Sequence, residues 1–248
     1  MRILFINPNT TAEFTRRVQE TVDLYAAPGT EAVACNPAAG PRSIECVYDE
    51  LLSAAPTLEV AISQLDQYDA FVIACVSDHP TVYALREITD KPVIGIFEAS
   101  VYYACMLGYK FSVVTTDEAW EPLLWDGIRH FGVAERCASV RSTRLPVLAL
   151  ESLTPEETGR VIRSTSEQAI GEDGAEVICL GCAGMSGMDK RLEQELQVPV
   201  VDGVVAALKL MEGMVGYGLH TSKKRAYLHP KRVELPNLPP VFGRAYRD

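Results

Sequence analysis

The stretch VIACVSDHP, residues 72–80, begins as a buried strand does and then places Cys75 where the chain leaves the sheet. A second stretch, VICLGCAGM at residues 177–185, ends another apolar run with another cysteine, Cys182. Free cysteine is among the most buried residue types, so either stretch alone favours a thiol that only fills the core. The recurrence of the same arrangement asks for a different explanation.

An internal repeat accounts for the recurrence. Sliding the chain along itself by 107 residues brings three pairs into register without a gap: Asn9 with Thr116, Cys75 with Cys182, and Pro92 with Pro199. Two similar lobes usually pack about an approximate twofold axis, and open parallel sheets bind ligands at the carboxyl ends of their strands. Both cysteines are at such ends. The repeat therefore predicts that they face each other across one cleft, closed by the loops after Asn9 and Thr116.

Short apolar runs alternate with longer amphipathic segments along the chain. The runs expected to form strands are residues 2–6, 31–35, 70–74, 92–96, 111–115, 176–180 and 198–202. The capping signals expected to open helices are Thr10 with Glu13, Thr154 with Pro155 and Glu157, and Ser186 with Asp189. Continuous apolar strands separated by helices indicate parallel sheets covered on both faces. We therefore predict an α/β fold of two pseudo-symmetric lobes, each a mostly parallel sheet flanked by helices, with the active site in the cleft between them.

The lobe boundaries follow from the repeat. The first lobe is expected to contain residues 1–98 and 204–222, and the second lobe residues 99–203. A Pro-containing tail follows at residues 223–248, and its basic residues are Lys223, Lys224, Arg225, Lys231, Arg232, Arg244 and Arg247. We interpret it as a solvated or subunit-covering tail.

Charge and cysteine content limit the class of protein. A net charge of −10, from 33 acidic and 23 basic side chains, repels phosphate backbones and anionic membranes, so neither nucleic acid nor a membrane is an expected partner. No apolar run reaches the roughly 18 residues of a membrane span, and MRILFINPNT lacks the signal-peptide pattern. Seven scattered cysteines, an odd number, are typical of reduced thiols, which predicts a cytoplasmic protein.

Motifs for metals, phosphates and a serine nucleophile are absent from the sequence. Cys179 and Cys182 form a lone C-x-x-C, and without a second pair or a histidine at ligand spacing no metal site is expected. The stretch GCAGMSG, residues 181–187, matches neither the phosphate-loop nor the dinucleotide fingerprint. It also lacks the G-x-S-x-G elbow, so Ser186 is interpreted as a helix cap. No cofactor is expected.

Two opposed thiols suit inversion at a carbon that bears an acidic hydrogen. One thiolate removes the proton from one face, the thiol on the other face delivers a proton, and the roles exchange for the other enantiomer. A free thiol has a pKa of about 8.5, so modest help from neighbouring amides supplies both forms near neutral pH. We expect the backbone amides that follow the two cysteines to hold a developing enolate. These are the amides of Val76, Ser77, Ala183 and Gly184.

Seven stretches, taken together, point to a known family. They are RILFINPNTT, GPRSIE (40–45), YDAFVIAC, RCASVR (136–141), LGCAGM, VPVVDGVVAA and YGLHTSK. In combination they resemble the hydantoin/allantoin racemases of the aspartate/glutamate racemase superfamily, over nearly the whole chain to about Lys223. The resemblance implies a cofactor-independent racemase of 5-substituted hydantoins, allantoin included, that takes a small-molecule substrate and assembles as a homo-oligomer. By position, Cys75 and Cys182 match the family's catalytic cysteines. The stretches that line the family's cleft contain Asn9, Ser43, Ile44, Thr115 and Thr116.

The residues that follow the cysteines bear on the substrate. Amino-acid racemases of the superfamily typically have Asn-Thr or Thr there, whereas this chain has Val76-Ser77 and Ala183-Gly184, which favours a neutral ring. The hydantoin branch usually reads A-C-F-G/D-D-P-G, whereas ACVSDHP lacks the aromatic residue and introduces a histidine. Two alternatives stay open. One is another superfamily reaction on the same scaffold, namely an amino-acid racemase, a decarboxylase or a cis-trans isomerase, and the other is a two-lobed small-molecule sensor without turnover.

Other conspicuous side chains have structural interpretations. His79 is expected to be a surface or helix-capping residue rather than a proton shuttle. Trp120 and Trp125 are expected to pack helices rather than to form a substrate cage. Glu98 either caps a helix or touches ligand, and Asp202 either orients loop amides or faces the cleft.

Overall fold

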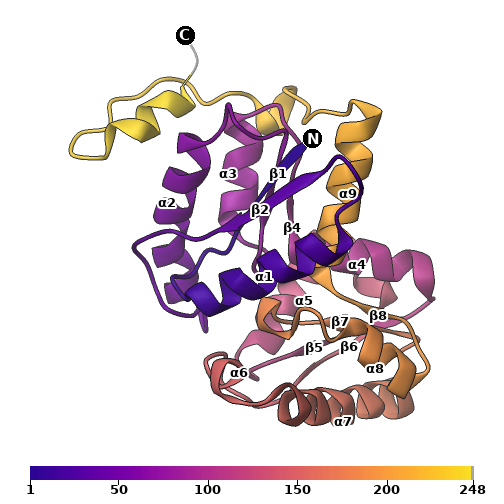
Figure 1. Ribbon diagram of the computed structural model, residues 1–248. Coiled ribbons are helices and arrows are strands. Elements are labelled where there is room, and N and C mark those ends of the chain that lie inside the picture. The colour runs from indigo at the N-terminus through magenta and orange to yellow at the C-terminus, as the bar shows by residue number, and fades with distance from the viewer. Residues whose placement is uncertain (247–248) are drawn as a thin grey trace.

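The computed structural model describes residues 1–246 and contains two four-stranded parallel sheets (Figure 1). The first has the order β2-β1-β3-β4, with β1 (Arg2–Ile6), β2 (Glu31–Cys35), β3 (Ala70–Ile73) and β4 (Val93–Gly95). The second has the order β6-β5-β7-β8, with β5 (Phe111–Thr115), β6 (Cys137–Ser142), β7 (Val177–Leu180) and β8 (Val200–Val201). The equal strand orders confirm the predicted α/β fold with two similar lobes.

The strands form where apolar side chains run without interruption, because helices cover both faces of these sheets. Every residue of β3 and of β7 is buried. β6 was missed as a strand because it lies at the edge of its sheet, where only Cys137 and Val140 are buried and the continuous apolar run is lost.

Nine helices connect the strands within residues 1–246, together with four short 3₁₀ turns. The helices are α1 (Ala12–Tyr25), α2 (Val47–Ser63), α3 (Pro80–Ile88), α4 (Ile96–Leu107), α5 (Trp120–His130), α6 (Ala149–Ser152), α7 (Pro155–Asp173), α8 (Asp189–Leu196) and α9 (Gly203–Tyr217). The turns are η1 (Ala134–Arg136), η2 (Ala183–Met185), η3 (Arg225–Tyr227) and η4 (Pro240–Ala245).

One of the three predicted capping signals is confirmed. Thr154 and Glu157 form a reciprocal capping box at the start of α7. The prediction for Thr10 was wrong, because α1 begins one residue later and the side chain of Asn9 accepts the Thr11 N–H at 2.9 Å. The prediction for Ser186 was also wrong, because a turn separates it from α8 and its hydroxyl bonds elsewhere.

The internal repeat is a repeat of structure. An offset of 107 residues carries β3 onto β7 and the start of α4 onto the start of α9, and β5 begins two residues later than that offset places it. The last helix of each half is exchanged between the lobes: α9 contacts β3, β4 and α1, whereas α4 contacts β5, β7 and β8. α4 and α9 also pack on each other, where the lobes meet in Figure 1. The residue-level lobe boundaries stay a prediction.

The two lobes share part of one apolar core. A single cluster of buried residues contains Phe5 and Val72 from the first sheet and Val113 from the second, together with Ile96 of α4 and Met211 of α9. Separate apolar clusters lie on the outer sides of the two sheets. The shared core holds the edges of the sheets that carry the two cysteines at a fixed separation.

The C-terminal tail packs on its own chain and is therefore not simply solvated. The ammonium of Lys223 donates to the backbone carbonyl of Arg86 at the end of α3, and the Arg86 guanidinium lies 5.8 Å from the ring centre of Tyr227. Ala245 is buried against the outer cluster of the first lobe. Figure 1 shows this segment above α2 and α3, where η4 contacts α2 and η3 contacts α3. Arg247, one of the basic residues of the predicted tail, lies outside the described residues.

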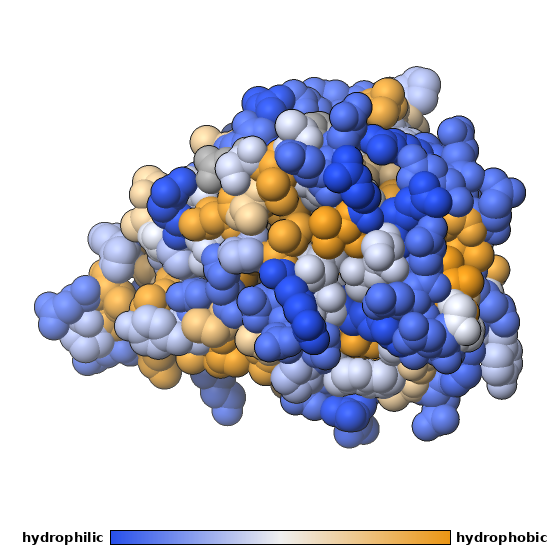
Figure 2. All heavy atoms as spheres, turned by 90° about the horizontal axis from the view of Figure 1, so that it is seen from below, coloured by the Kyte–Doolittle hydropathy of each residue, from blue (hydrophilic) through white to orange (hydrophobic). Residues whose placement is uncertain are grey.

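The surface is mostly hydrophilic on the side of the second lobe. Figure 2, which views the molecule from the end that carries α7 and α8, shows hydrophilic residues over most of this face with smaller groups of apolar residues between them. Within residues 1–246, no helix combines the length and the apolar character that a membrane-spanning helix needs.

Candidate active site

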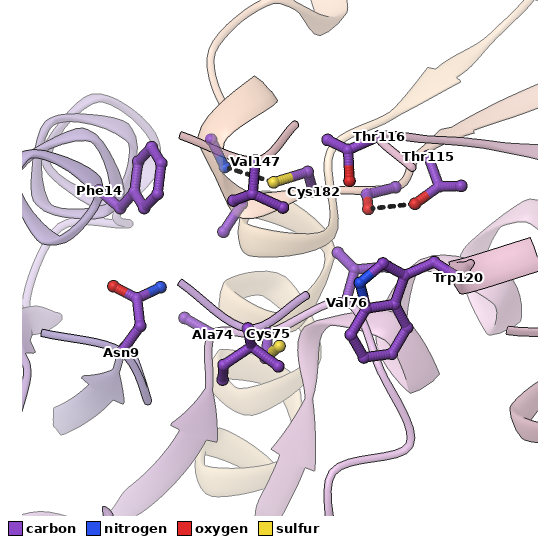
Figure 3. A pocket seen from close by; sticks show the side chains of 14 residues that line it. Asn9, Phe14, Ala74, Cys75, Val76, Thr115, Thr116, Trp120, Val147 and Cys182 are labelled. Carbon is purple, nitrogen blue, oxygen red and sulfur yellow. Dashed lines mark hydrogen bonds between the residues drawn. The ribbon is translucent and has the colours of Figure 1, made fainter. Parts of the chain in front are cut away.

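A pocket lies between the lobes at the carboxyl ends of β3, β5 and β7 (Figure 3). Its empty volume is about 450 Å³. Its lining residues are Asn9, Phe14, Ile44, Ala74, Cys75, Val76, Thr115, Thr116, Trp120, Val147, Gly181, Cys182, Ala183 and Gly184. They come from both halves of the chain, as the repeat predicts for a site at the approximate twofold axis.

Cys75 and Cys182 lie on opposite walls of this pocket, one from each lobe (Figure 3). Each follows the last residue of its strand by two positions, Ile73 for Cys75 and Leu180 for Cys182. The two thiols therefore occupy equivalent positions relative to the ends of β3 and β7.

Cys75 lies in an environment that favours its protonated form. Burial raises the pKa of the Cys75 thiol well above its usual range, and the nearby Glu50 carboxylate raises it further. The Ser77 hydroxyl donates to the Cys75 sulfur at 3.5 Å, which opposes part of this rise. At neutral pH the protonated thiol is therefore the main form of Cys75.

Cys182 has partners that favour its thiolate more strongly. The pKa of Cys182 is raised to about 11, chiefly by burial. The Gly184 N–H, which donates to the sulfur at 3.4 Å, and the charge of Arg17 both oppose this rise. The charge of Glu45 acts in the opposite direction. Because the Gly184 N–H points at the thiol, it supports that sulfur rather than a ligand oxygen.

Asn9 and Thr116, which the repeat pairs, both line the pocket. The Asn9 carbonyl oxygen is occupied by the Thr11 N–H and by the side-chain amide of Asn7 at 3.0 Å, and Figure 3 shows its nitrogen turned toward the pocket. The Thr115 hydroxyl donates to the Gly181 carbonyl at 3.3 Å, which joins β5 to the chain just before Cys182. Asn9 therefore presents a hydrogen-bond donor and Thr115 fixes the opposite wall.

Two of the predicted substrate-binding residues do not line the pocket. The Ser43 hydroxyl donates to the Glu45 carboxylate at 2.7 Å, and of this stretch it is Ile44 that reaches the pocket. Ser77 lies behind Cys75, where it borders a neighbouring outer hollow that Glu50 and Trp120 also line. The other predicted residues, Asn9, Ile44, Val76, Thr115, Thr116, Ala183 and Gly184, do line the pocket.

Several pocket residues were missed from the sequence. Trp120 was expected only to pack. It is buried, with a relative exposure of 5%, and it also lines the pocket. Phe14, Val147 and Ala74 are apolar residues whose sequence pattern does not distinguish a pocket wall from a core. Gly181 was not predicted either, although its place directly before Cys182 is a signal that could have found it. Trp125 does pack against the shared core, with the Arg129 guanidinium 5.7 Å from its ring centre.

The histidine of the VSDHP stretch is a buried helix cap. His79 is 1% exposed, and its Nδ1 accepts the Thr81 N–H at 3.3 Å at the start of α3. Its Nε2 therefore carries the proton and donates to the Ser53 hydroxyl at 2.9 Å, which in turn donates to the Glu50 carbonyl. The prediction of a capping role is confirmed, and the prediction of a surface position was wrong.

The two acidic residues left open in the sequence have structural partners. Asp202 is 4% exposed and accepts hydrogen bonds from the Ser186 hydroxyl and from the amides of Gly187 and Val204. It therefore orients loop amides. Glu98 pairs with Arg86 at 2.7 Å and is not among the pocket-lining residues.

The described residues contain no group of three histidine, cysteine or acidic side chains placed to hold a metal ion. Cys179 of the C-x-x-C lies fully buried in β7, and its thiol donates to the Ser100 carbonyl at 3.8 Å. Cys179 therefore belongs to the core, whereas Cys182 lines the pocket.

Comparison with known proteins supplies the family context of this geometry. The family model described as Asp/Glu/Hydantoin racemase matches residues 3–211. A hydantoin racemase from Pseudomonas sp. (strain NS671) is 43% identical over 245 residues, which cover 98% of this chain and 98% of that protein. Two solved structures superpose closely. An allantoin racemase from Pseudomonas fluorescens has a TM-score of 0.91 at 40% identity, covering 95% of this chain and 99% of the other. An allantoin racemase from Klebsiella pneumoniae has a TM-score of 0.93 at 37% identity, with 99% of both chains covered.

Proposed function

Because this chain belongs to the Asp/Glu/Hydantoin racemase family, we propose that it is an isomerase that racemises hydantoin-type rings, allantoin included, by proton transfer between Cys75 and Cys182. The observation that carries the proposal is the placement of the two thiols on opposite walls of one pocket. An inversion needs one base and one acid on opposite faces of the same carbon, and this pocket offers one thiol to each face.

The reaction follows from that placement. A thiolate on one wall removes the C5 proton, and the electrons left behind are delocalised onto the neighbouring ring carbonyl as an enolate. The thiol on the other wall then donates its proton to C5 from the opposite face. The ring leaves with inverted configuration, and the two sulfurs have exchanged protonation states. The Asn9 amide, turned toward the pocket, supplies a hydrogen bond to a ring carbonyl oxygen.

The pocket lining supports a neutral ring as the substrate. The described residues that line it carry amide, hydroxyl, apolar and thiol side chains and no carboxylate, ammonium or guanidinium. A free amino acid would leave its ammonium and carboxylate without charged partners there, and unpaired buried charges are costly. Val76 and Trp120 form apolar walls against which a flat ring and its C5 substituent pack.

The site and surface also support two expectations about the protein in the cell. Seven free thiols favour a reducing compartment, and we propose a cytoplasmic location.

An exposed apolar stripe on α2, made of Val47, Tyr48, Leu51 and Leu52 with exposures of 45% to 69%, supports a homo-oligomer. Sedimentation of the chain and of a Leu51→Asp variant tests the assembly, and a monomer at micromolar concentration would contradict it.

Polarimetry tests the racemase proposal directly. Single enantiomers of allantoin and of hydantoins with aliphatic and aromatic C5 substituents are incubated with the protein, and the loss of optical rotation is followed. We expect rotation to fall to zero at catalytic protein concentrations. Chiral chromatography should then show the two enantiomers in equal amounts, and mass spectrometry should show an unchanged mass. Binding without loss of rotation would indicate a sensor, and a change of mass would indicate a decarboxylase.

A further inference from the structure

The charged groups around the two thiols are unlike, although the repeat makes their backbones alike. Glu50 from α2 acts on Cys75, and Arg17 from α1 acts on Cys182. Neither residue lines the pocket itself. Each reaches its thiol through one intervening residue.

On the Cys75 side the intervening residue is Ser77. Its hydroxyl has a single proton and donates to the Cys75 sulfur at 3.5 Å, and Ser77 borders the same outer hollow as Glu50. Burial raises the pKa of Glu50, and Ser77 opposes part of this rise. One Glu50 oxygen is buried with no hydrogen-bond partner among the described residues, so this carboxylate competes strongly for that proton. A hydroxyl that turns to Glu50 no longer stabilises a thiolate on Cys75.

On the Cys182 side the intervening residue is Gly184. The Arg17 guanidinium donates to the Gly184 carbonyl at 2.8 Å and to the Leu150 carbonyl at 3.0 Å, and the Gly184 N–H donates to the Cys182 sulfur at 3.4 Å. The Arg17 side chain is only 20% exposed, so water weakens its charge less than at an open surface. Glu13 pairs with Arg17, and Glu45 opposes its effect on the thiol, yet the N–H and the guanidinium both favour a negative sulfur.

The repeat does not reproduce these charges at the opposite thiol. The residue 107 positions after Arg17 is Leu124, which is buried in the shared core. The residue 107 positions after Glu50 is Glu157, which forms the capping box of α7 with Thr154. The groups that shift the pKa of Cys75 are Glu50, Ser77 and Cys182, and no basic residue is among them.

We propose that Glu50 and Arg17 decide which thiol of the pair is the base, so that the first proton lost from the pair leaves Cys182 while Cys75 keeps its own. Both are positioning residues, because neither touches the substrate. In the free protein the form with a Cys182 thiolate and a Cys75 thiol is then the main singly ionised form. The inference rests on the proposed function: the form with a Cys182 thiolate is ready for the enantiomer whose C5 hydrogen faces Cys182.

Thiol alkylation without substrate tests the assignment. Iodoacetamide is applied in short pulses from pH 7 to pH 9.5, and peptide mass spectrometry quantifies the modification of each cysteine. Only the thiolate reacts, so the pH dependence of each rate reports its ionisation. In the wild-type chain we expect Cys182 to react before Cys75 as pH rises. Faster reaction of Cys75 would overturn the proposal.

Two variants separate the charges, each with a matched control on its own helix. Glu50→Gln should raise the Cys75 rate at fixed pH about tenfold, the effect of one pKa unit on a minor thiolate, and Arg17→Gln should lower the Cys182 rate by a similar factor. The control variants Glu59→Gln on α2 and Arg16→Gln on α1 change exposed residues and should leave both alkylation rates unchanged. Unchanged rates in Glu50→Gln or in Arg17→Gln would contradict the proposal.

Arg17→Lys distinguishes charge from loop positioning. Lysine keeps the positive charge but loses the forked bonds to the two carbonyls, so the Cys182 rate should stay near the wild-type value if charge is what matters. Equal losses in Arg17→Lys and Arg17→Gln would show a purely structural role and overturn the proposal. Because alkylation needs no substrate, a failure of the racemase proposal would appear in polarimetry alone and leave these rates as they are.

Discussion

Gly181 touches the backbone of Val114 so closely that a Cβ at position 181 would lie 2.5 Å from the Val114 carbonyl oxygen. The same oxygen accepts the Gly181 N–H at 2.8 Å, which continues the pairing of β5 with β7 by one residue. Cys182 follows at once. The absence of a side chain at Gly181 thus lets the chain stay against β5 and turn the thiol into the pocket.

Substitution of Gly181 by alanine should therefore damage both stability and the site. The added methyl meets backbone rather than a flexible side chain, so we expect a loss of about 1–3 kcal/mol in the free energy of unfolding, typical of overpacking, and a large fall in racemisation. Gly171→Ala is the matched control, because a Cβ there meets nothing within 4 Å in α7, and helix propensity should make it neutral or stabilising. Urea unfolding and polarimetry of both variants check this. Equal behaviour of the two would contradict it.

Replacement of either active-site thiol should separate proton exchange from inversion. In Cys75→Ser or Cys182→Ser, one hydroxyl is too weak an acid to form the needed base near neutral pH, so inversion should nearly cease. The remaining thiolate still faces one enantiomer. In deuterated water each variant should therefore exchange the C5 hydrogen of one enantiomer, and the two variants should select opposite enantiomers.

Background exchange is subtracted, and the double Cys→Ser variant is the control that should show neither process while melting normally by circular dichroism. Near-normal racemisation by Cys75→Ser, or a lowered melting temperature as its only effect, would mean that Cys75 merely fills the core.

The rate of racemisation should rise with pH between pH 7 and pH 10. Burial raises the pKa of Cys182 to about 11, so across this window its thiolate is the minor form and grows about tenfold per pH unit. Initial rates at low substrate concentration, corrected for the uncatalysed reaction, measure this. A flat profile would show that proton removal does not limit the rate.

Filling the pocket beside Cys75 with a larger side chain should change substrate preference. Val76→Phe adds volume to the pocket wall without touching either thiol, so bulky C5 substituents should lose more activity than allantoin. Relative rates across the polarimetric screen test this, with Val60→Phe on α2, outside the pocket, as a control for general effects of the larger side chain. The same order of rates in Val76→Phe and wild type would place the C5 substituent elsewhere.

His79 should make the fold sensitive to acid. Burial lowers the pKa of His79 from 6.5 to about 4, so below pH 6.5 the unfolded chain binds a proton that the folded chain refuses. Stability from this residue is complete above pH 6.5 and is lost as pH falls toward 4, by about 3 kcal/mol in all. Urea titrations from pH 8 to pH 4.5 should show a shallower decline for His79→Asn, which keeps an N-cap acceptor, than for wild type. The exposed His220→Asn should decline as wild type does.

The sequence predicted those features that depend on local pattern or on the repeat. Continuous apolar runs predicted seven of the eight strands, and the edge strand β6 was missed because solvent on one side interrupts its apolar pattern. The 107-residue offset predicted the opposed cysteines. Trp120 and Val147 were not predicted as pocket residues because a pocket wall and a core use the same apolar side chains. Arg17 and Glu50 act across the fold, and no local pattern signals such contacts.

The exchange of α4 and α9 makes each half of the chain incomplete by itself. A cut between Leu107 and Phe111 would give two fragments, each holding the helix that covers the other fragment's sheet. Neither fragment could bury its own sheet fully until the two reassociated. If both halves were identical, the same exchange would produce a twofold dimer with a thiol from each copy at its axis. In the single chain, the contact that would be a subunit interface in that dimer is an internal contact between the two halves. Because the halves are joined in one chain, their sequences can differ, and one carries Arg17 where the other carries Leu124.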